Sequence, residues 1–217
     1  IIASMDYELS GLRKGLSSLV SGSKGHSSEA RAQNASPNLE VIGVGKEHAQ
    51  ATVRLILEEQ ASQPDSPGFY NDSRLLLVGV AGAVDPALST GDLVLSSRYF
   101  RDSQIPDLRR LDVGIGPTLT PDAAMWQLAV KACQAGGRKP VYTDSLTADR
   151  IISSPELKKS IADAYPVGIV EMEDYWVAEV AAEFGVAFLS VRVVLDPAKQ
   201  ALPPWLLGLS KAKEKAA

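Results

Sequence analysis

The stretch VGIVEMEDYWVAEVAAEFGVAFLSVRVVLD, residues 167–196, decides the fold class of this 217-residue chain. An apolar run opens it and predicts a buried strand over 167–173. A longer segment with helical periodicity follows over 174–185 and ends in glycine, which predicts a helix. A second apolar run predicts a strand over 186–196. Near-continuous apolar strands that alternate with helices indicate an α/β sheet covered on both faces.

The same alternation extends through the rest of the chain. The predicted strands cover residues 1–3, 39–45, 74–82, 92–100 and 140–145. The predicted helices cover residues 9–19, 46–61, 121–136 and 154–165, and Ser154 is a suitable cap for the last of them. Polar or irregular loops are expected over 20–37 and 101–120. Because the chain shows neither a repeat nor a linker, a single domain is expected over 1–217.

The composition argues against several classes of protein. With 45% apolar and 22% charged residues, the chain has the composition of an ordinary globular domain. A net charge of −4 disfavours nucleic acid as a partner. Cys133 is the single cysteine, which fits a reducing cytoplasm and leaves no cysteine-rich metal site. No apolar run reaches the roughly 18 residues of a membrane span. No metal site is expected.

A buried strand ends in small residues within VGVAGAVDPALSTGD, residues 78–92. Gly79, Ala81, Gly82 and Ala83 would let a ligand approach the backbone N–H groups closely. The alternative is an ordinary tight turn. The stretch lacks the Lys-Ser/Thr of a nucleotide-binding P-loop and the glycine spacing of a dinucleotide fingerprint.

Acidic residues lie at the end of the strand predicted over 167–173. Glu171 and Glu173 lie at the carboxyl end of this strand, where ligands of parallel α/β sheets gather. Strand alternation would point both side chains the same way if the strand continues that far. The alternative is that Glu173 or Asp174 caps the next helix, whose positive end favours acids.

The last predicted strand carries Arg192 and ends in Asp196. Arg192 is a candidate partner for the acids at the end of the earlier strand. Asp196 is open to two interpretations: a turn residue before Pro197, or a member of a cleft shared with Glu171 and Glu173.

Taken together, four stretches resemble the nucleoside phosphorylase/nucleosidase superfamily. They are VGVAGAVDPALSTGDLVLS (78–96), the opening stretch extended to 167–198, VIGVGKEHAQATV (41–53) and IIASMDYEL (1–9). The last of these resembles the first strand and turn of the methylthioadenosine/S-adenosylhomocysteine nucleosidases. The resemblance implies a three-layer α/β/α domain around a central mixed, largely parallel sheet.

The resemblance also implies roles for individual residues. Glu173 would bind ribose hydroxyls with Met172 packed against the sugar, and Asp196 would protonate the departing purine. Glu8 stands where the nucleosidases keep an acidic base, and would activate water. Further substrate-binding candidates are Val80, Ala81, Gly82, Ile151, Ile152, Glu171 and Arg192.

The chain departs from the family pattern at several of these positions. Val80 replaces a residue that often carries a hydroxyl, and Leu195 replaces a serine that supports the catalytic acid in the nucleosidases. Ile151 or Ile152 must serve where an aromatic residue commonly stacks on the base. Asp174 follows Glu173 where a small residue is usual.

The expected function is cleavage of the N-glycosidic bond of a purine nucleoside-like substrate, by water or by phosphate as co-substrate. No other cofactor is expected. The alternative is a non-catalytic nucleoside-binding or sensing module on the same scaffold. The resemblance also implies a homodimer or larger homo-oligomer.

The ending LDPAKQALPPWLLGL, residues 195–209, is similar to the hopanoid-associated phosphorylase group. That similarity implies an adenosylhopane-type substrate and a peripheral contact with its lipid part. Trp205, Leu206 and Leu207 would then form an apolar wall for the lipid. The alternative is that they pack on the domain or on another subunit.

Overall fold

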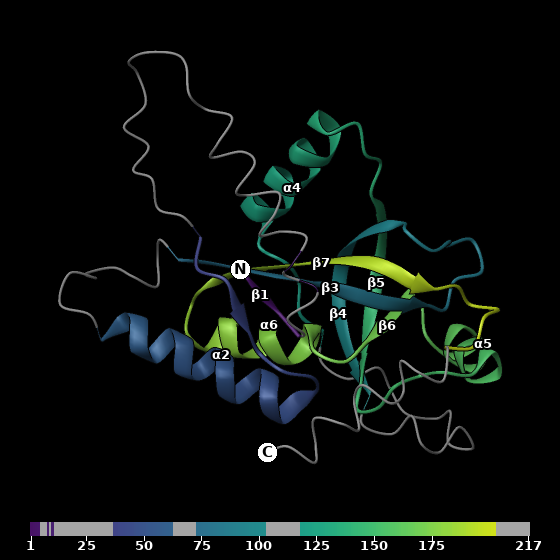
Figure 1. Cartoon of the computed structure of the whole chain (residues 1–217), viewed down its shortest axis with the longest axis horizontal. Coiled ribbons are helices and arrows are strands. Elements are labelled where there is room, and N and C mark those ends of the chain that lie inside the picture. Colours follow the sequence, from purple (N-terminus) through teal and green to yellow (C-terminus); the bar gives the residue numbers. More distant parts are fainter. Residues whose placement is uncertain (5–7, 9, 11–36, 63–72, 103–117, 203–217) are drawn as a thin grey trace.

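The computed structural model of the chain describes residues 1–4, 8, 10, 37–62, 73–102 and 118–202. Figure 1 shows how its elements are arranged. The strands are β1 (Ile2–Ala3), β2 (Glu40–Val41), β3 (Arg74–Ala83), β4 (Leu93–Asp102), β5 (Val141–Ala148), β6 (Ile169–Glu171) and β7 (Ala187–Asp196). The helices are α2 (Lys46–Ala61), α4 (Ala123–Ala135), α5 (Pro155–Ala164) and α6 (Asp174–Glu183). None of the described helices is both long and apolar enough to cross a membrane.

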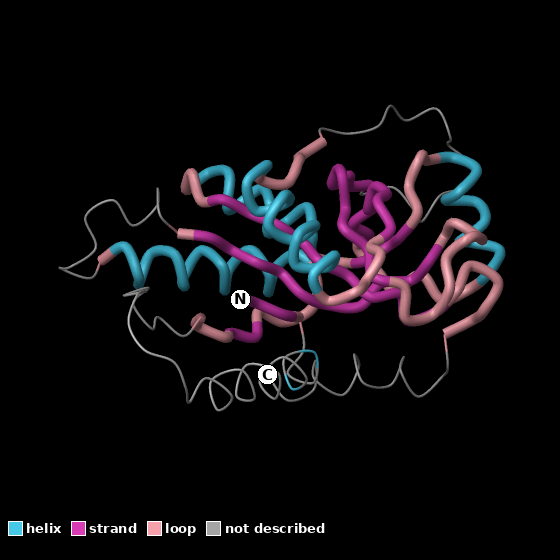
Figure 2. The backbone as a smooth tube through the Cα atoms, turned by 90° about the horizontal axis from the view of Figure 1, so that it is seen from above, coloured by secondary structure: helices cyan, strands magenta, loops and turns pink. Residues whose placement is uncertain are grey.

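The described strands form one mixed, largely parallel sheet in the order β2-β1-β3-β6-β5-β4-β7, with β3 also paired to β7. The antiparallel pairings are β3 with β6 and β4 with β7. Because β7 pairs with both β3 and β4, the strands β3, β7, β4, β5 and β6 close into a ring. Seen from above in Figure 2, these strands curve strongly.

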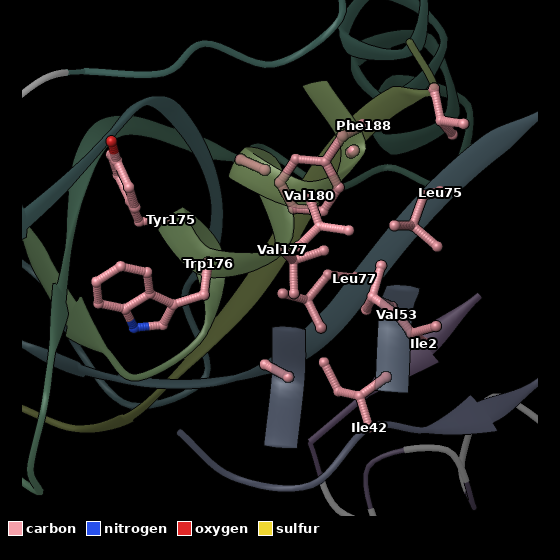
Figure 3. Packing of buried hydrophobic residues seen from close by; sticks show 14 of the residues in the cluster. Ile2, Ile42, Val53, Leu75, Leu77, Tyr175, Trp176, Val177, Val180 and Phe188 are labelled. Carbon is pink, nitrogen blue, oxygen red and sulfur yellow. The ribbon is translucent and has the colours of Figure 1, made fainter. Parts of the chain in front are cut away.

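The largest apolar cluster lies where α2 and α6 pack together against the sheet (Figure 1). Val53 of α2 and Val177 of α6 meet Leu77 of β3 in this cluster, and Phe188 of β7 joins them (Figure 3). Full burial of such a side chain contributes roughly 1.5–3 kcal/mol. The helix α4 lies on the opposite side of the sheet, so the three-layer α/β/α architecture is confirmed.

Sequence chemistry at the helix starts explains where the helices begin. The hydroxyl of Ser154 accepts a hydrogen bond from the N–H of Leu157 at 3.1 Å, so this predicted cap of α5 is confirmed. At α4 the cap is Asp122, whose Oδ1 accepts from the N–H of Met125 at 2.9 Å. The helix therefore begins just after the predicted start at residue 121.

Two predicted strands are shorter than the sequence indicated. The strand expected over 39–45 is reduced to β2, because Gly43 and Gly45 adopt φ of 80° and 83°, which no strand accommodates. The strand expected over 167–173 ends at Glu171, where the chain turns into α6. The predicted helix 9–19, and most of the loops 20–37 and 101–120, lie outside the described residues. The extent of the domain, 1–217, stays a prediction.

Candidate active site

The candidate site lies where one edge of β3 is not paired with a strand. β7 occupies the other edge, while this edge pairs first with β1, at 77–78, and then with β6, at 82–83. Between these pairings the N–H of Val80 donates to Glu8 Oε1 at 3.0 Å. The carbonyl of Val80 accepts from Arg192 Nη1 at 3.4 Å. Side chains therefore take the hydrogen bonds that a neighbouring strand would make along residues 79–81, called here the open stretch of β3.

Two glycines of β3 let charged side chains approach this edge. A Cβ atom at Gly79 would lie 2.3 Å from Arg192 Nη1 and 3.0 Å from Glu8 Oε1. A Cβ atom at Gly82 would lie 3.3 Å from each carboxylate oxygen of Asp196. The small residues predicted as a ligand-approach stretch thus admit the protein's own acids, from Glu8 near the start of the chain and from Asp196 at the end of β7.

Arg192 gathers three acids in the interior. Its Nε and Nη2 donate to Asp174 Oδ1 at 2.9 and 2.6 Å. Nη2 also contacts Glu171 Oε2 at 3.1 Å and Glu173 Oε2 at 3.4 Å. All four side chains are at most 5% exposed. Arg192 is therefore the structural partner of the acids, and its role in binding substrate stays a prediction.

The side chain that caps α6 belongs to Glu171, and not to Glu173 or Asp174, the two candidates from the sequence. Glu171 Oε2 accepts from the backbone N–H groups of Glu173 and Asp174, each at 2.6 Å. Glu173 occupies the cap position but its side chain makes no capping hydrogen bond. Glu171 also accepts from the hydroxyl of Thr147 on β5. Glu171 thus holds the start of α6 in place, which leaves Glu173 available for another task.

Glu173 reaches the start of α2. Its Oε1 accepts from the N–H of Gly45 at 3.1 Å, directly before the helix begins. Met172 lies beside the same turn, with its Cε 3.8 Å from the position of a Cβ atom on Gly45. Glu173 and Met172 are therefore neighbours beside Gly45, and their joint role at a sugar stays a prediction.

Burial shifts the pKa values of the acids in this cluster. Burial and the charge of Asp174 raise the pKa of Glu171 to about 8. Burial also raises the pKa of Glu173, while the charge of Arg192 opposes that rise. Burial opposes the charge of Arg192, but the carboxylates of Asp174 and Glu171 raise its pKa above the ordinary value. Three acids around one cation leave an excess of negative charge, which favours holding a proton among them.

Asp196 ends β7 with 3% exposure. Its carboxylate forms an ion pair with Lys158 of α5, a fully buried lysine. Burial raises the pKa of Asp196, and the hydrogen bond and charge of Lys158 oppose this rise. The direction is the one that a proton donor near neutral pH needs.

The apolar candidates occupy different depths. Ile152 is 4% exposed and packs in the cluster that also holds Leu146 and Val170, and Ala81 is 4% exposed in a second cluster. Val80, Ile151 and Leu195 are half-buried. Ile152 therefore belongs to the core beneath the site, and contact of these residues with substrate stays a prediction.

Three residues that build this site were not predicted from the sequence: Gly45, Thr147 and Lys158. Lys158 carried a readable signal, because it lies three residues before Ile161 and so shares the buried face of a predicted helix. The contacts of Gly45 and Thr147 depend on tertiary structure. No group of three His, Cys, Asp or Glu residues suited to a metal ion occurs in the described part of the chain.

Known proteins share this architecture. The structure of the 5'-methylthioadenosine/S-adenosyl homocysteine nucleosidase of Campylobacter jejuni matches with a TM-score of 0.70 and 20% identity, over 98% of this chain and 93% of that one. The futalosine hydrolase of Helicobacter pylori matches with a TM-score of 0.69 and 18% identity, over 99% and 92%. At these identities, the likeness establishes the fold.

Sequence comparison points in the same direction. A 5'-methylthioadenosine/S-adenosylhomocysteine nucleosidase of Bacillus thuringiensis subsp. konkukian is 26% identical over 167 residues, which cover 71% of this chain and 65% of that protein. The match thus spans less than two thirds of that relative's length. The model of the Phosphorylase superfamily matches residues 1–215. The chain therefore belongs to the Phosphorylase superfamily, as the resemblance of its motifs implied.

Proposed function

We propose that this protein cleaves the N-glycosidic bond of a purine nucleoside-like substrate. The observation that carries the proposal is that Glu8 and Asp196 approach nearby residues of β3, Glu8 at Val80 in the open stretch and Asp196 at Gly82 directly after it. Glu8 accepts a hydrogen bond from Val80, and Asp196 lies against Gly82, two residues further along the strand. A base and an acid on opposite sides of the bond are the arrangement that single-step glycosidic hydrolysis uses.

Each acid has a task in this reaction. Cleavage passes through a sugar with oxocarbenium character, whose positive charge nearby carboxylates stabilise. Asp196 protonates the purine as it leaves, and general acid catalysis of this kind contributes about 10²–10⁴-fold. Glu173 binds ribose hydroxyls, and Met172 packs on the sugar. These roles correspond to the positions of the two side chains beside Gly45.

Glu8 favours water over phosphate as the nucleophile. A carboxylate at this position can take a proton from water, whereas it would repel the phosphate anion. Product analysis tests the choice: a sugar 1-phosphate that forms only when phosphate is supplied would overturn hydrolysis. The relatives called 5'-methylthioadenosine/S-adenosylhomocysteine nucleosidases make thioether nucleosides the first substrates to test.

A non-catalytic nucleoside-binding module is the second candidate. Val80 and Leu195 favour it, because both replace residues whose hydroxyls support the reaction in the resembling enzymes. The retained acids favour the enzyme. A binding module would take up adenine or a nucleoside in calorimetry and release no free base over hours.

The deciding experiment is a nucleoside panel with and without phosphate, read by chromatography of the free base. The panel contains adenosine, methylthioadenosine, S-adenosylhomocysteine, futalosine and adenosylhopane. We expect release from at least one of them. If no free base is released from any nucleoside, at concentrations where calorimetry detects binding, the enzymatic function is wrong and the non-catalytic binding module is favoured.

The variant Asp196→Asn is the matched test of the mechanism. Its amide can accept a hydrogen bond from Lys158 but has no titrating proton for the base. We expect turnover of the accepted substrate to fall about 10²–10⁴-fold with the fold retained. Asp163→Asn, an acid 64% exposed on α5, is the control and should leave turnover unchanged. Wild-type turnover in Asp196→Asn would show that the proton comes from elsewhere.

The lipid substituent of the substrate, the cellular location, the oligomeric state and the cofactor requirement stay proposals. An apolar substituent on the sugar, as in adenosylhopane, is supported by the apolar, half-buried residues at three positions of the predicted site: Val80, Ile151 and Leu195. The predicted lipid wall, Trp205 with Leu206 and Leu207, lies outside the described residues. Cytoplasmic location, a homo-oligomer and the absence of a cofactor other than phosphate also stay predictions.

A further inference from the structure

Lys158 is a buried charge that the proposed reaction has not yet used. It lies on α5 with 0% of its side chain exposed, whereas the side chain of its neighbour Lys159 is 74% exposed. Lys159 binds Asp163 one helical turn further along, as a surface lysine commonly does. Burying an ammonium costs several kcal/mol unless acceptors surround it. The position therefore calls for an explanation.

The surroundings of the Lys158 ammonium consist of oxygen acceptors. Its Nζ donates to Asp196 Oδ2, to the carbonyl of Pro197 at 2.9 Å and to the carbonyl of Gln200 at 3.0 Å. The carbonyl of Asp196 lies at 3.5 Å. An ammonium has three protons to donate and no acceptor. This arrangement supplies an acceptor for each of the three.

These contacts tie Asp196 to the turn that follows it. Figure 1 shows α5 beside the end of β7, so one side chain from the helix fixes both the carboxylate and the backbone of 197–200. The same carboxylate lies against Gly82 of β3, directly after the open stretch. Any movement of Lys158 would thus move the acid relative to the leaving base.

Few other groups act on Asp196. From β3 it is faced by Gly82, and Val170 of β6 lies beside the same position. From α5, Asp196 is faced by Lys158. Among the described residues, Lys158 is the cation that pairs with Asp196. Lys199, in the turn, is exposed to solvent. Two further acids, Glu8 and Glu173, share the site, so the contribution of Asp196 has to be isolated.

We propose that Lys158 is the positioning residue of this site: it orients the Asp196 carboxylate toward the purine and sets the pH range over which Asp196 carries the proton that it donates. The proposal rests on the proposed glycosidic cleavage. A neighbouring ammonium favours the carboxylate form, so Asp196 gives its proton to the departing base more readily. In the step itself the proton moves from Asp196 to the purine nitrogen as the C–N bond breaks, and Asp196 regains a proton from solvent before the next turnover.

The primary test compares Lys158→Met, Lys158→Gln and the control Lys159→Met. Without the ammonium, Asp196 stays protonated to higher pH and is a weaker acid. We expect the alkaline limb of the kcat/KM profile to move up by at least about one pH unit in both Lys158 variants. We also expect kcat at pH 6 to fall at least about tenfold, since general acid efficiency follows acid strength. Lys159→Met should match the wild type.

The limb is assigned to Asp196 by its loss in Asp196→Asn. An unmoved alkaline limb in a folded Lys158 variant, with only a lower kcat, would reduce Lys158 to a packing residue and overturn the proposal. Lys158→Gln separates the two effects of the ammonium, because its amide can still donate to a carbonyl but has no charge. If the alkaline limb moves in Lys158→Met but not in Lys158→Gln, the charge of Lys158 is not the cause of the shift, and the proposal is wrong.

A second measurement needs no turnover. The pH dependence of adenine affinity, measured by calorimetry, should shift in the same direction in both Lys158 variants, by at least about one pH unit. If the wild type binds adenine but cleaves no nucleoside, this shift still supports the role of Lys158 while the proposed cleavage fails. If cleavage is found and neither profile shifts, the proposed function stands and the role of Lys158 fails.

Failure to fold is also informative. If both Lys158 variants unfold, the double variant Lys158→Met/Asp196→Leu replaces the ion pair with apolar side chains of similar size, which is often tolerated. Recovery of a cooperative unfolding transition in the double variant supports Lys158 acting through Asp196. No recovery means that its essential partners are the carbonyls of the turn, and the proposal is wrong.

Discussion

Two buried cations organise this molecule, and their surroundings differ. Arg192 faces three carboxylates, from Glu171, Glu173 and Asp174, whereas Lys158 faces one carboxylate and backbone carbonyls. The first cluster has more acids than its cation can neutralise, and the second is balanced. The first therefore stores a proton and fixes the architecture around β6 and α6. The second cluster fixes the position of its acid, Asp196, beside β3.

The largest effect is expected from removing the cation of the first cluster. Arg192→Met leaves three buried carboxylates without their cation, although each keeps a hydrogen bond from a neutral donor. The free energy of unfolding should fall by about 3–5 kcal/mol. Urea unfolding followed by far-UV circular dichroism measures it. Arg54→Met is the control, because the Arg54–Glu183 pair is about half exposed and such pairs contribute about 0–1 kcal/mol. A similar loss in both variants would remove the distinction between buried and surface pairs.

The stored proton predicts a pH dependence of stability. The pKa of Glu171 is about 8 in the folded protein and near 4.5 in the unfolded chain. The folded state therefore binds the proton more tightly, and the contribution is complete below pH 4.5 and is lost as the pH rises through 8. The free energy of unfolding should fall by up to about 1.4 kcal/mol per pH unit in this window.

Glu171→Gln should flatten that slope, and Glu58→Gln, on the exposed face of α2, should not. Urea unfolding at half-unit steps from pH 5 to 8.5 provides the comparison. A slope that persists unchanged in Glu171→Gln would place the proton on another member of the Arg192 cluster.

The two glycines of β3 report on the two clusters separately. In Gly79→Ala the new Cβ would lie 2.3 Å from Arg192 Nη1, so we expect a loss of about 1–3 kcal/mol from overpacking. In Gly82→Ala it would lie 3.3 Å from the Asp196 oxygens, so the loss of stability should be below about 1 kcal/mol. Turnover should nevertheless fall in Gly82→Ala, because the acid must shift. Thermal melts with parallel activity assays measure both, and the reverse order of stability would contradict the packing described here.

Local sequence signals predicted the elements that have strong boundaries. The helix over 46–61 and the Ser154 cap were readable because periodicity and capping are local properties. The strand at 167–173 was predicted too long, because Glu171 turns back to bind the N–H groups of Glu173 and Asp174. Nothing in the alternation of residues announces such a turn.

The site was readable in part. Glu173 and Asp196 were predicted from their places at strand ends and Glu8 from the resemblance. The structure brings Glu8 and Asp196 to the same part of β3. The partner of Asp196 was not named, because two adjacent lysines, 158 and 159, look alike in a helical segment. Only the shared face with Ile161 distinguishes them, and that signal is weak beside the usual exposure of lysine.

The closed ring of strands has a consequence for association with other chains. A strand at a sheet edge offers unpaired N–H and C=O groups that can recruit another polypeptide. In β3, β7, β4, β5 and β6 the closure leaves no terminal strand, and β2, the terminal strand of the described sheet, is two residues long. The described strands therefore offer few unpaired backbone groups to which a strand of another chain could add. Within the part of the chain that the structure describes, side-chain surfaces offer more to an oligomer contact than strand edges do, and natural selection can tune their composition residue by residue.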